Sequence, residues 1–169
     1  MQNFWKNLPK PFFALAPMAD VTDAPFRRLI AKYSRHGQAD GGPQVFWTEF
    51  VSADGLASPV REALKIDLLY TEGERPIVAQ LFSSRPEKMR EAARLCAELG
   101  FDGVDINMGC PDKSIEKQGC GAAMIKTPEI ATLIIQAAKD GIRDAGKDIP
   151  VSVKTRVGYN KVEIETWIP

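Results

Sequence analysis

The feature that most restricts how this chain can fold is a regular alternation of short apolar segments with longer helical patterns. The apolar segments lie at 12–16, 45–50, 76–82, 101–106 and 150–156. Parallel strands that helices cover on both faces are apolar in this way, with little alternation of polar and apolar residues. The pattern therefore predicts a parallel α/β fold.

Local signals predict where the intervening helices begin. Thr22 is the expected N-cap of the first long helix, whose apolar face includes Leu29. Ser84 and Glu87 have the spacing of a capping box at the start of the second. Pro128 is expected at the first position of the third, because proline fits the first turn of a helix.

Five strand–helix units in 169 residues are compatible with two architectures. One is a (β/α)8 barrel, which needs about 250 residues when complete. The other is a complete five-stranded doubly wound sheet. No Gly-rich nucleotide-binding motif follows the first strand, and a new helical pattern starts at 161–167. We therefore predict a TIM-type barrel truncated after about five βα units, with residues 1–169 forming one partial catalytic domain.

The composition argues against several classes of function. Lys plus Arg and Asp plus Glu both total 22, so the net charge gives no general attraction to nucleic acid or membranes. No apolar run approaches the roughly 18 residues of a membrane span, and the first residues lack the core of a signal peptide. The three cysteines lack C-x-x-C spacing. We expect a cytoplasmic protein with free thiols, no membrane segment and no metal site.

Cys110 is the strongest candidate for chemistry. It lies between Gly109 and Pro111, just after the fourth predicted strand. In parallel α/β folds, functional groups gather in the loops beyond the carboxyl ends of the strands. Cysteine is also a common small core residue, as we expect for Cys96 on the apolar stripe of a helix. The position of Cys110 favours a reactive thiol over simple packing.

Polar residues interrupt the apolar strands near their carboxyl ends. They are Gln80, Asp105, Asn107 and Lys154. Burying such a group without a partner costs about 1–3 kcal/mol. Each is therefore expected either to pair within the protein or to serve a ligand. Lys154 shares one strand face with Arg156, and it either forms an ion pair with Asp105 or reaches into a site.

Two further groups are expected at the same end of the fold. The residues Pro17, Met18 and Ala19 follow the first strand, where they either pack a flat aromatic ligand or fill the loop. Lys113 and Arg156 form either a solvated rim or a surface that contacts phosphate groups.

Five segments taken together resemble the tRNA-dihydrouridine synthases. They are APMADVTD at 16–23, TEFVSA at 48–53, VAQLF at 78–82, GVDINMGCP at 103–111 and VSVKTR at 151–156. They follow the order of that family and span nearly the whole chain. Each is modestly specific alone, and the set is strongly specific.

The resemblance implies an FMN-binding TIM barrel that reduces uridine to 5,6-dihydrouridine in tRNA, with NADPH or NADH as reductant. Hydride passes from reduced FMN to C6 of the uracil, and the cysteine that corresponds to Cys110 protonates C5. A thiol suits this role because it is mostly protonated at neutral pH. The implied flavin-side residues are Pro17, Met18, Ala19, Gln80, Asn107 and Lys154. The implied substrate or tRNA residues are Asn107, Arg156 and Lys113.

The chain departs from the family pattern in two ways. Asp20 stands where the family usually has glycine. The last three barrel strands and the helical domain of the family are not covered, and the flavin phosphate usually sits at those strands. We therefore expect the 169-residue chain alone to bind FMN weakly and to reduce little tRNA.

Three other interpretations remain open at this point. The first is another FMN-dependent barrel enzyme, such as a dihydroorotate or dihydropyrimidine dehydrogenase, which acts on a free pyrimidine. The second is an aldolase that forms a Schiff base through Lys154. The third is an inactive fragment.

Overall fold

The computed structural model describes residues 3–168, which form one five-stranded parallel sheet in the order β1-β2-β3-β4-β5. The strands are β1 (Ala14–Leu15), β2 (Val45–Ser52), β3 (Ile77–Phe82), β4 (Gly103–Met108) and β5 (Val151–Thr155). Each strand lies beside its neighbour in sequence, so all connections step in one direction, as in a barrel. A doubly wound sheet reverses direction part-way. The predicted TIM-type barrel of about five βα units is confirmed.

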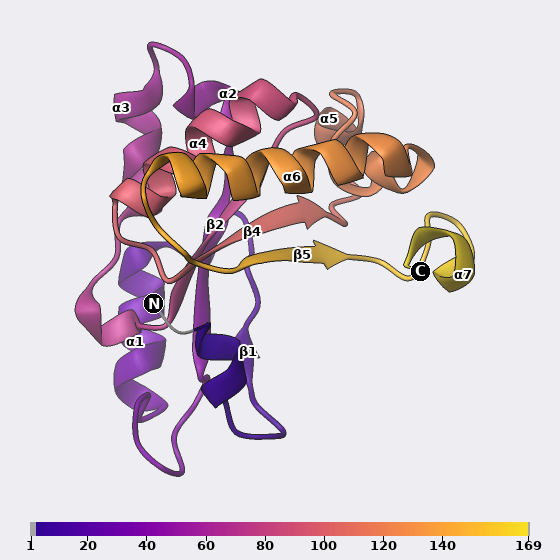
Figure 1. Ribbon diagram of the computed structural model, residues 1–169. Coiled ribbons are helices and arrows are strands. Elements are labelled where there is room, and N and C mark those ends of the chain that lie inside the picture. The colour runs from indigo at the N-terminus through magenta and orange to yellow at the C-terminus, as the bar shows by residue number, and fades with distance from the viewer. Residues whose placement is uncertain (1–2, 169) are drawn as a thin grey trace.

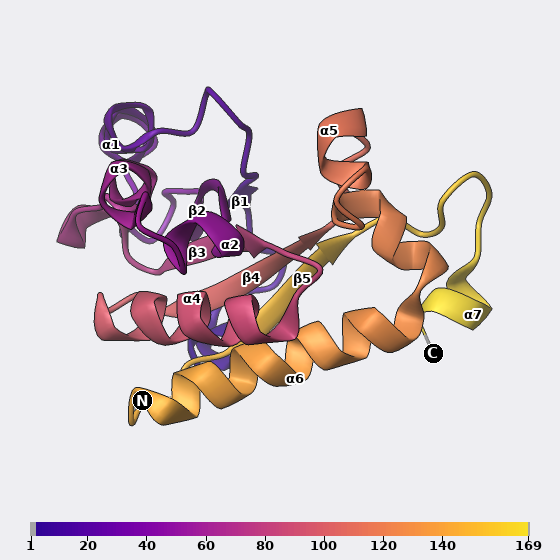
Figure 2. The same ribbon diagram turned by 90° about the horizontal axis from the view of Figure 1, so that it is seen from above.

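Helices cover the outer face of this sheet. They are α1 (Ala24–Tyr33), α2 (Ala53–Leu56), α3 (Arg61–Leu64), α4 (Pro86–Glu98), α5 (Lys113–Glu116), α6 (Pro128–Asp144) and α7 (Ile164–Trp167), with short 3-10 helices at Phe4–Asn7, Lys65–Leu68, Glu72–Glu74 and Gly121–Lys126. Figure 1 shows α5 and α7 beyond the arrowheads of β4 and β5, and Figure 2 shows α4 beside α6 along one face of the sheet. Within residues 3–168, no helix combines the length and the apolar character that crossing a bilayer requires.

The main core lies between the outer face of the central strands and helices α4 and α6. Leu81 of β3 and Ile106 of β4 are fully buried there, together with Met89 and Cys96 of α4. Alternation along a strand sends every second residue to the opposite face. The residues between these core positions therefore point to the inner, concave face of the half-barrel.

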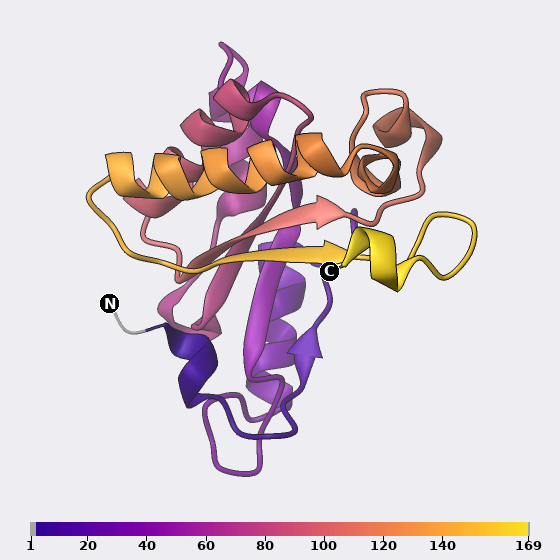
Figure 3. The same cartoon turned by 45° about the vertical axis from the view of Figure 1, so that its right-hand side comes forward.

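The N-terminal segment covers one end of that inner face. Phe4 and Trp5 pack against Trp47 of β2 and Val78 of β3, and the ring centroids of Trp5 and Trp47 are 5.9 Å apart. Figure 3 shows this segment near the start of β5, opposite its arrowhead. The inner face is therefore closed at the amino ends of the strands.

The predicted N-cap of the first helix was wrong by one residue. Asp23 is the N-cap of α1, and its Oδ1 accepts a hydrogen bond from the Phe26 amide at 2.8 Å. Thr22 is fully buried, and its hydroxyl bonds to the backbone of Met18 instead. The side chain of Thr22 is therefore used to close the loop that follows β1.

The predicted capping box of α4 is also wrong. Helix α4 begins at Pro86, with Arg85 at the N-cap position and no side-chain cap. The Ser84 hydroxyl donates to the carbonyl of Gln118 at 2.6 Å. This contact ties the loop after β3 to the loop after β4.

The buried face of α1 contains a charged residue that the apolar pattern did not predict. Leu29 is 54% exposed, whereas Arg27 is fully buried. The Arg27 guanidinium donates to Glu74 Oε2 at 2.7 Å and to the carbonyl of Thr22 at 2.6 Å. It also donates to the carbonyl of Leu69 at 2.5 Å. Arginine is rarely buried without such a set of partners.

Candidate active site

The polar side chains on the inner face form two adjacent rows across β3, β4 and β5. The strand register pairs Gln80 with Asp105 and Asp105 with Ser152. The next row pairs Asn107 with Lys154. The strand-end polar residues that the sequence singled out thus lie on one face, in the layered arrangement of barrel interiors.

Asp105 is the centre of the first row. Its Oδ2 accepts from Gln80 Nε2 at 2.6 Å, and its Oδ1 accepts from the Ser152 hydroxyl at 2.6 Å. Burial raises the pKa of Asp105, and these two hydrogen bonds and the charge of Lys154 oppose that rise. Lys154 itself is exposed, and no salt bridge joins it to Asp105 among the described residues.

A cleft of about 270 Å³ opens on the inner face beside this row. Its walls come from four strands, the loop after β1 and the N-terminal segment. They are Trp5, Ala14, Ala16, Pro17, Trp47, Asp105, Ser152, Val153 and Lys154. Trp47 Nε1 is buried and makes no hydrogen bond of normal geometry among the described residues. The indole nevertheless lies near the Asp105 carboxylate, where it helps to hold the pKa of Asp105 down.

The backbone around Cys110 is held by hydrogen bonds on both sides. Asn107 Oδ1 accepts from the amides of Gly109 at 3.1 Å and of Cys110 at 3.0 Å. The carbonyl of Cys110 accepts from the amide of Ala122 at 2.8 Å. The half-buried Cys110 side chain packs beside Phe82. The loop therefore presents its thiol in a fixed position.

Gly121 is required by this arrangement. Its φ is +61°, and a Cβ on it would lie 2.5 Å from the Cys110 carbonyl oxygen. A larger residue would thus be strained in backbone conformation and would collide with the loop. The turn around Cys120 is therefore a tight backbone turn against the Cys110 loop.

The other two thiols are less accessible than that of Cys110. Cys96 is fully buried, and burial raises its pKa to about 12. Cys120 is 2% exposed, and burial raises its pKa as well. The expectation that Cys96 is a core residue is confirmed.

Arg156 contacts the Cys110 loop directly. Its Nε donates to the carbonyl of Gly109 at 2.7 Å, although the side chain is exposed. The neighbouring Thr155 hydroxyl donates to the carbonyl of Met108 at 3.0 Å. Lys113 lies in α5, exposed and two residues beyond Pro111. The end of β5 therefore braces the loop after β4, and both cations lie on its rim.

The loop after β1 contributes unequally to the site. Pro17 lines the cleft, whereas the side chains of Met18 and Ala19 are exposed. Asp20 has φ +58°, in the left-handed region that favours glycine. The glycine that the family resemblance leads one to expect here would fit this conformation, and Asp20 adopts it with a side chain.

The carboxylate of Glu49, in the second half of β2, lies near this loop. Burial raises the pKa of Glu49, and the negative charges of Asp67, Asp20 and Asp23 add to the effect. A backbone hydrogen bond from Asp20 opposes it. A group of carboxylates therefore surrounds the loop after β1, whereas Lys154 and Arg156 lie at the end of β5.

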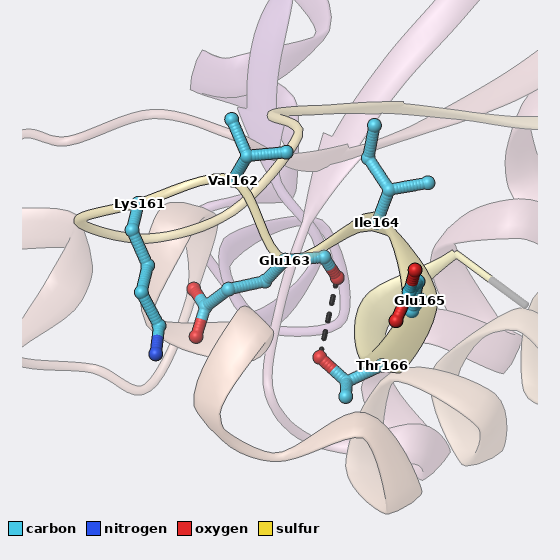
Figure 4. A pocket seen from close by; sticks show the side chains of 6 residues that line it. All are labelled: Lys161, Val162, Glu163, Ile164, Glu165 and Thr166. Carbon is cyan, nitrogen blue, oxygen red and sulfur yellow. Dashed lines mark hydrogen bonds between the residues drawn. The ribbon is translucent and has the colours of Figure 1, made fainter.

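A larger hollow of about 660 Å³ lies elsewhere, around the turn that leads into α7. Figure 4 shows its six side chains, which come from one continuous segment at 161–166. The Thr166 hydroxyl donates to the carbonyl of Glu163 at 3.2 Å. This hollow contains none of the predicted site residues, so its size does not make it the candidate site.

Only two of the nine residues that line the cleft, Pro17 and Lys154, were predicted as site residues from the sequence. The seven others include Trp47, Asp105 and Ser152. Strand alternation already placed Ser152 on the face of Lys154, and the register then brings Asp105 opposite Ser152. Trp47 lies in an apolar strand, where core packing explains a tryptophan as well as a binding site does. The sequence alone therefore did not mark it as a site residue.

The fold and the site together define a class: parallel half-barrel proteins with a loop cysteine and a polar inner face at the carboxyl ends of the strands. The family model "Dihydrouridine synthase" matches residues 14–167. The chain belongs to this family.

Curated relatives agree with that assignment. "Probable tRNA-dihydrouridine synthase 2" of Bacillus subtilis (strain 168) is 44% identical over 169 residues, which are 99% of this chain and 48% of the relative. "Probable tRNA-dihydrouridine synthase" of Staphylococcus aureus (strain COL) is 42% identical over 167 residues, 98% of this chain and 46% of the relative. The chain thus spans about half the length of the curated relatives it matches.

Proposed function

We propose that this chain forms the flavin-side half of a tRNA-dihydrouridine synthase, which reduces uridine to 5,6-dihydrouridine in tRNA. The observation that supports this most is the position of Cys110. Its loop is held by Asn107, which belongs to the polar rows beside the cleft. The family match and the names of the relatives support the substrate class.

The walls of the cleft suit a flat ring with polar edges, as in FMN. Pro17, Trp5 and Trp47 offer apolar surface, and Lys154 offers a cation. The indole N–H of Trp47, which lies near Asp105 without a close hydrogen bond, offers one more donor. FMN, when bound, would supply the hydride to C6 of the uracil, with NADPH or NADH as its reductant. Its proposed contacts are Pro17, Met18, Ala19, Gln80, Asn107 and Lys154.

The residues of the chain would contribute charge and a proton. The Lys154 ammonium would stabilise negative charge on a reduced flavin ring, because opposite charges attract strongly at a partly desolvated site. The Cys110 thiol would give its proton to C5 of the uracil. Asn107 would hold the Cys110 backbone while that proton moves.

The rim would face the tRNA. Arg156 and Lys113 are exposed on either side of the Cys110 loop, where they would pair with phosphate groups. The target uridine would have to leave its stack to reach a thiol that is half-buried.

The test uses this segment in two forms: alone, and in place of the matching half of the Bacillus subtilis relative. Each is given FMN, NADPH and unmodified tRNA, and nuclease digests of the tRNA are analysed by mass spectrometry for dihydrouridine, which has two more hydrogens than uridine. We expect the chimera to form dihydrouridine and the segment alone to form little. Cys110→Ala in the chimera should abolish dihydrouridine formation and keep the flavin absorbance.

Two results would contradict the proposal. One is a chimera that holds flavin but leaves tRNA unchanged while reducing free uracil or dihydroorotate-type substrates. The other is a Cys110→Ala chimera as active as its parent. Cys96→Ala is the matched control, because Cys96 is fully buried in the core on the outer face of the sheet, and it should still form dihydrouridine.

A further inference from the structure

A continuous set of side-chain hydrogen bonds runs from β5 to the Cys110 loop. The Ser152 hydroxyl donates to Asp105, and Gln80 Nε2 donates to the other oxygen of that carboxylate. Asn107 Nδ2 then donates to Gln80 Oε1 at 3.4 Å. Asn107 Oδ1 accepts from the Gly109 and Cys110 amides. Gln80, Asp105 and Asn107 are 1%, 2% and 8% exposed, so water does not compete freely for these bonds.

The carboxylate at one end of this set and the backbone N–H groups at the other end are consistent with one orientation of the Gln80 and Asn107 side-chain amides. An ionised carboxylate only accepts, so Gln80 must turn its NH2 group towards Asp105 and its oxygen towards Asn107. Backbone N–H groups only donate, so Asn107 must turn its oxygen towards the Cys110 loop and its NH2 group towards Gln80. A reversed amide at either position would bring two donors or two acceptors together.

We propose that Asp105 is a positioning residue, whose buried carboxylate fixes the orientation of Gln80 and Asn107 and, through Asn107, the backbone of Cys110. Asp105 needs no contact with flavin or uracil for this role. The inference takes its meaning for catalysis from the proposed function of Cys110. Its test uses no flavin, reductant or tRNA, so it succeeds or fails independently of that function.

The experiment measures amide hydrogen exchange by NMR on the ¹⁵N-labelled 169-residue chain. Asp105→Leu has nearly the same size but accepts no hydrogen bond, so Gln80 loses its anchor. One hydrogen bond changes stability by about 0.5–1.5 kcal/mol, so exchange of the Gly109 and Cys110 amides should rise about fivefold. Amides in α4 and α6 should exchange as in the unmodified chain.

Asp105→Asn is the conservative rescue. Its Oδ1 still accepts from Gln80, and its NH2 group meets the Ser152 hydroxyl, which accepts as readily as it donates. Exchange at Gly109 and Cys110 should therefore stay near the rate of the unmodified chain. A purely structural need for a carboxylate would instead make Asp105→Asn as harmful as Asp105→Leu.

Asp102→Leu is the matched control. Asp102 lies just before the other end of β4, where it bonds to Arg75 and to the Ile77 amide. Removing its carboxylate should leave the Gly109 and Cys110 amides unchanged.

Unchanged exchange of these two amides in Asp105→Leu would overturn the proposal, as would equal acceleration in the Asn and Leu variants. If Asp105→Leu does not fold, Gln80→Met interrupts the set one step later and should give the same local acceleration. Unchanged exchange in Gln80→Met would overturn the proposal equally.

Discussion

Polar side chains are buried and paired in the centre of the sheet but are exposed at its edges. All six residues of β3 and all six of β4 are buried, whereas among the described residues neither β1 nor β5 has a fully buried one. In the centre, Gln80 and Asp105 satisfy each other. At the edge, Lys154 faces solvent. The centre therefore fixes geometry, while the edges carry the groups that remain available to a ligand.

The largest expected effect comes from Arg27, the fully buried charged residue of α1. Arg27→Met removes the closer of the two arginines that pair with the buried Glu74 and leaves it only Arg28 at 3.8 Å and the hydrogen bonds from Thr71, which should lower the free energy of unfolding by about 3 kcal/mol. Urea unfolding measures this change.

Arg90→Met is the matched control for that experiment. Arg90 pairs with Asp144 on the surface, where solvent screens the two charges, so its loss should change stability little. Equal losses of stability in the two variants would show that the buried ion pair contributes no more than the exposed one.

A pair of core truncations tests the contrast between centre and edge directly. Ile106→Ala in β4 removes a fully buried side chain and should cost about 2–5 kcal/mol. Val153→Ala in β5 removes a half-buried one and should cost on the order of 1 kcal/mol. The two values come from the same urea titration, and similar losses would contradict the comparison.

Glu49 should make the β1–β2 side sensitive to pH. Its pKa in the folded chain is raised from 4.5, so the folded state holds this proton more tightly than the unfolded state does. Stability from Glu49 is therefore present below pH 4.5 and is lost as pH rises through the folded pKa. Glu49→Gln should match the unmodified chain in acid and exceed it at neutral pH.

The smallest expected effect concerns Asp20. Its left-handed backbone costs less in glycine, and glycine also loses more entropy on folding. The two effects partly cancel, so Asp20→Gly should raise the free energy of unfolding by about 0.5 kcal/mol. A higher thermal midpoint reports this change. Asp40→Gly, at a position without positive φ, should lower it. A loss in both variants would show that Asp20 is not strained.

Periodicity predicted the fold well because burial and helix cover act on whole segments. It placed five strands, and it placed Cys110 at the carboxyl end of β4. It failed at Ser84 and Arg27, where the outcome depends on a partner far away in sequence, and at Thr22, whose hydroxyl bonds to the nearby Met18 backbone instead of capping the helix. Arg27 is buried because Glu74 lies 47 positions later, and no local pattern contains that information.

The candidate site was predicted only as far as individual residues. Gln80, Asn107 and Lys154 were recognised as polar residues in apolar strands. Their mutual arrangement follows from strand register, which sets Gln80 opposite Asp105 and Asn107 opposite Lys154. Register depends on the packing of the whole sheet. The role of Asp105 as the common acceptor therefore became visible only in three dimensions.

Trp5 and Trp47 both line the cleft, and the chain has three tryptophans in all. The third, Trp167, donates its indole N–H to Thr155 at 2.9 Å and stands outside that cleft. Indole fluorescence responds to neighbouring chromophores and to local polarity. The unlabelled protein therefore carries an optical reporter built into the wall of its candidate site, with Trp167 as the internal reference.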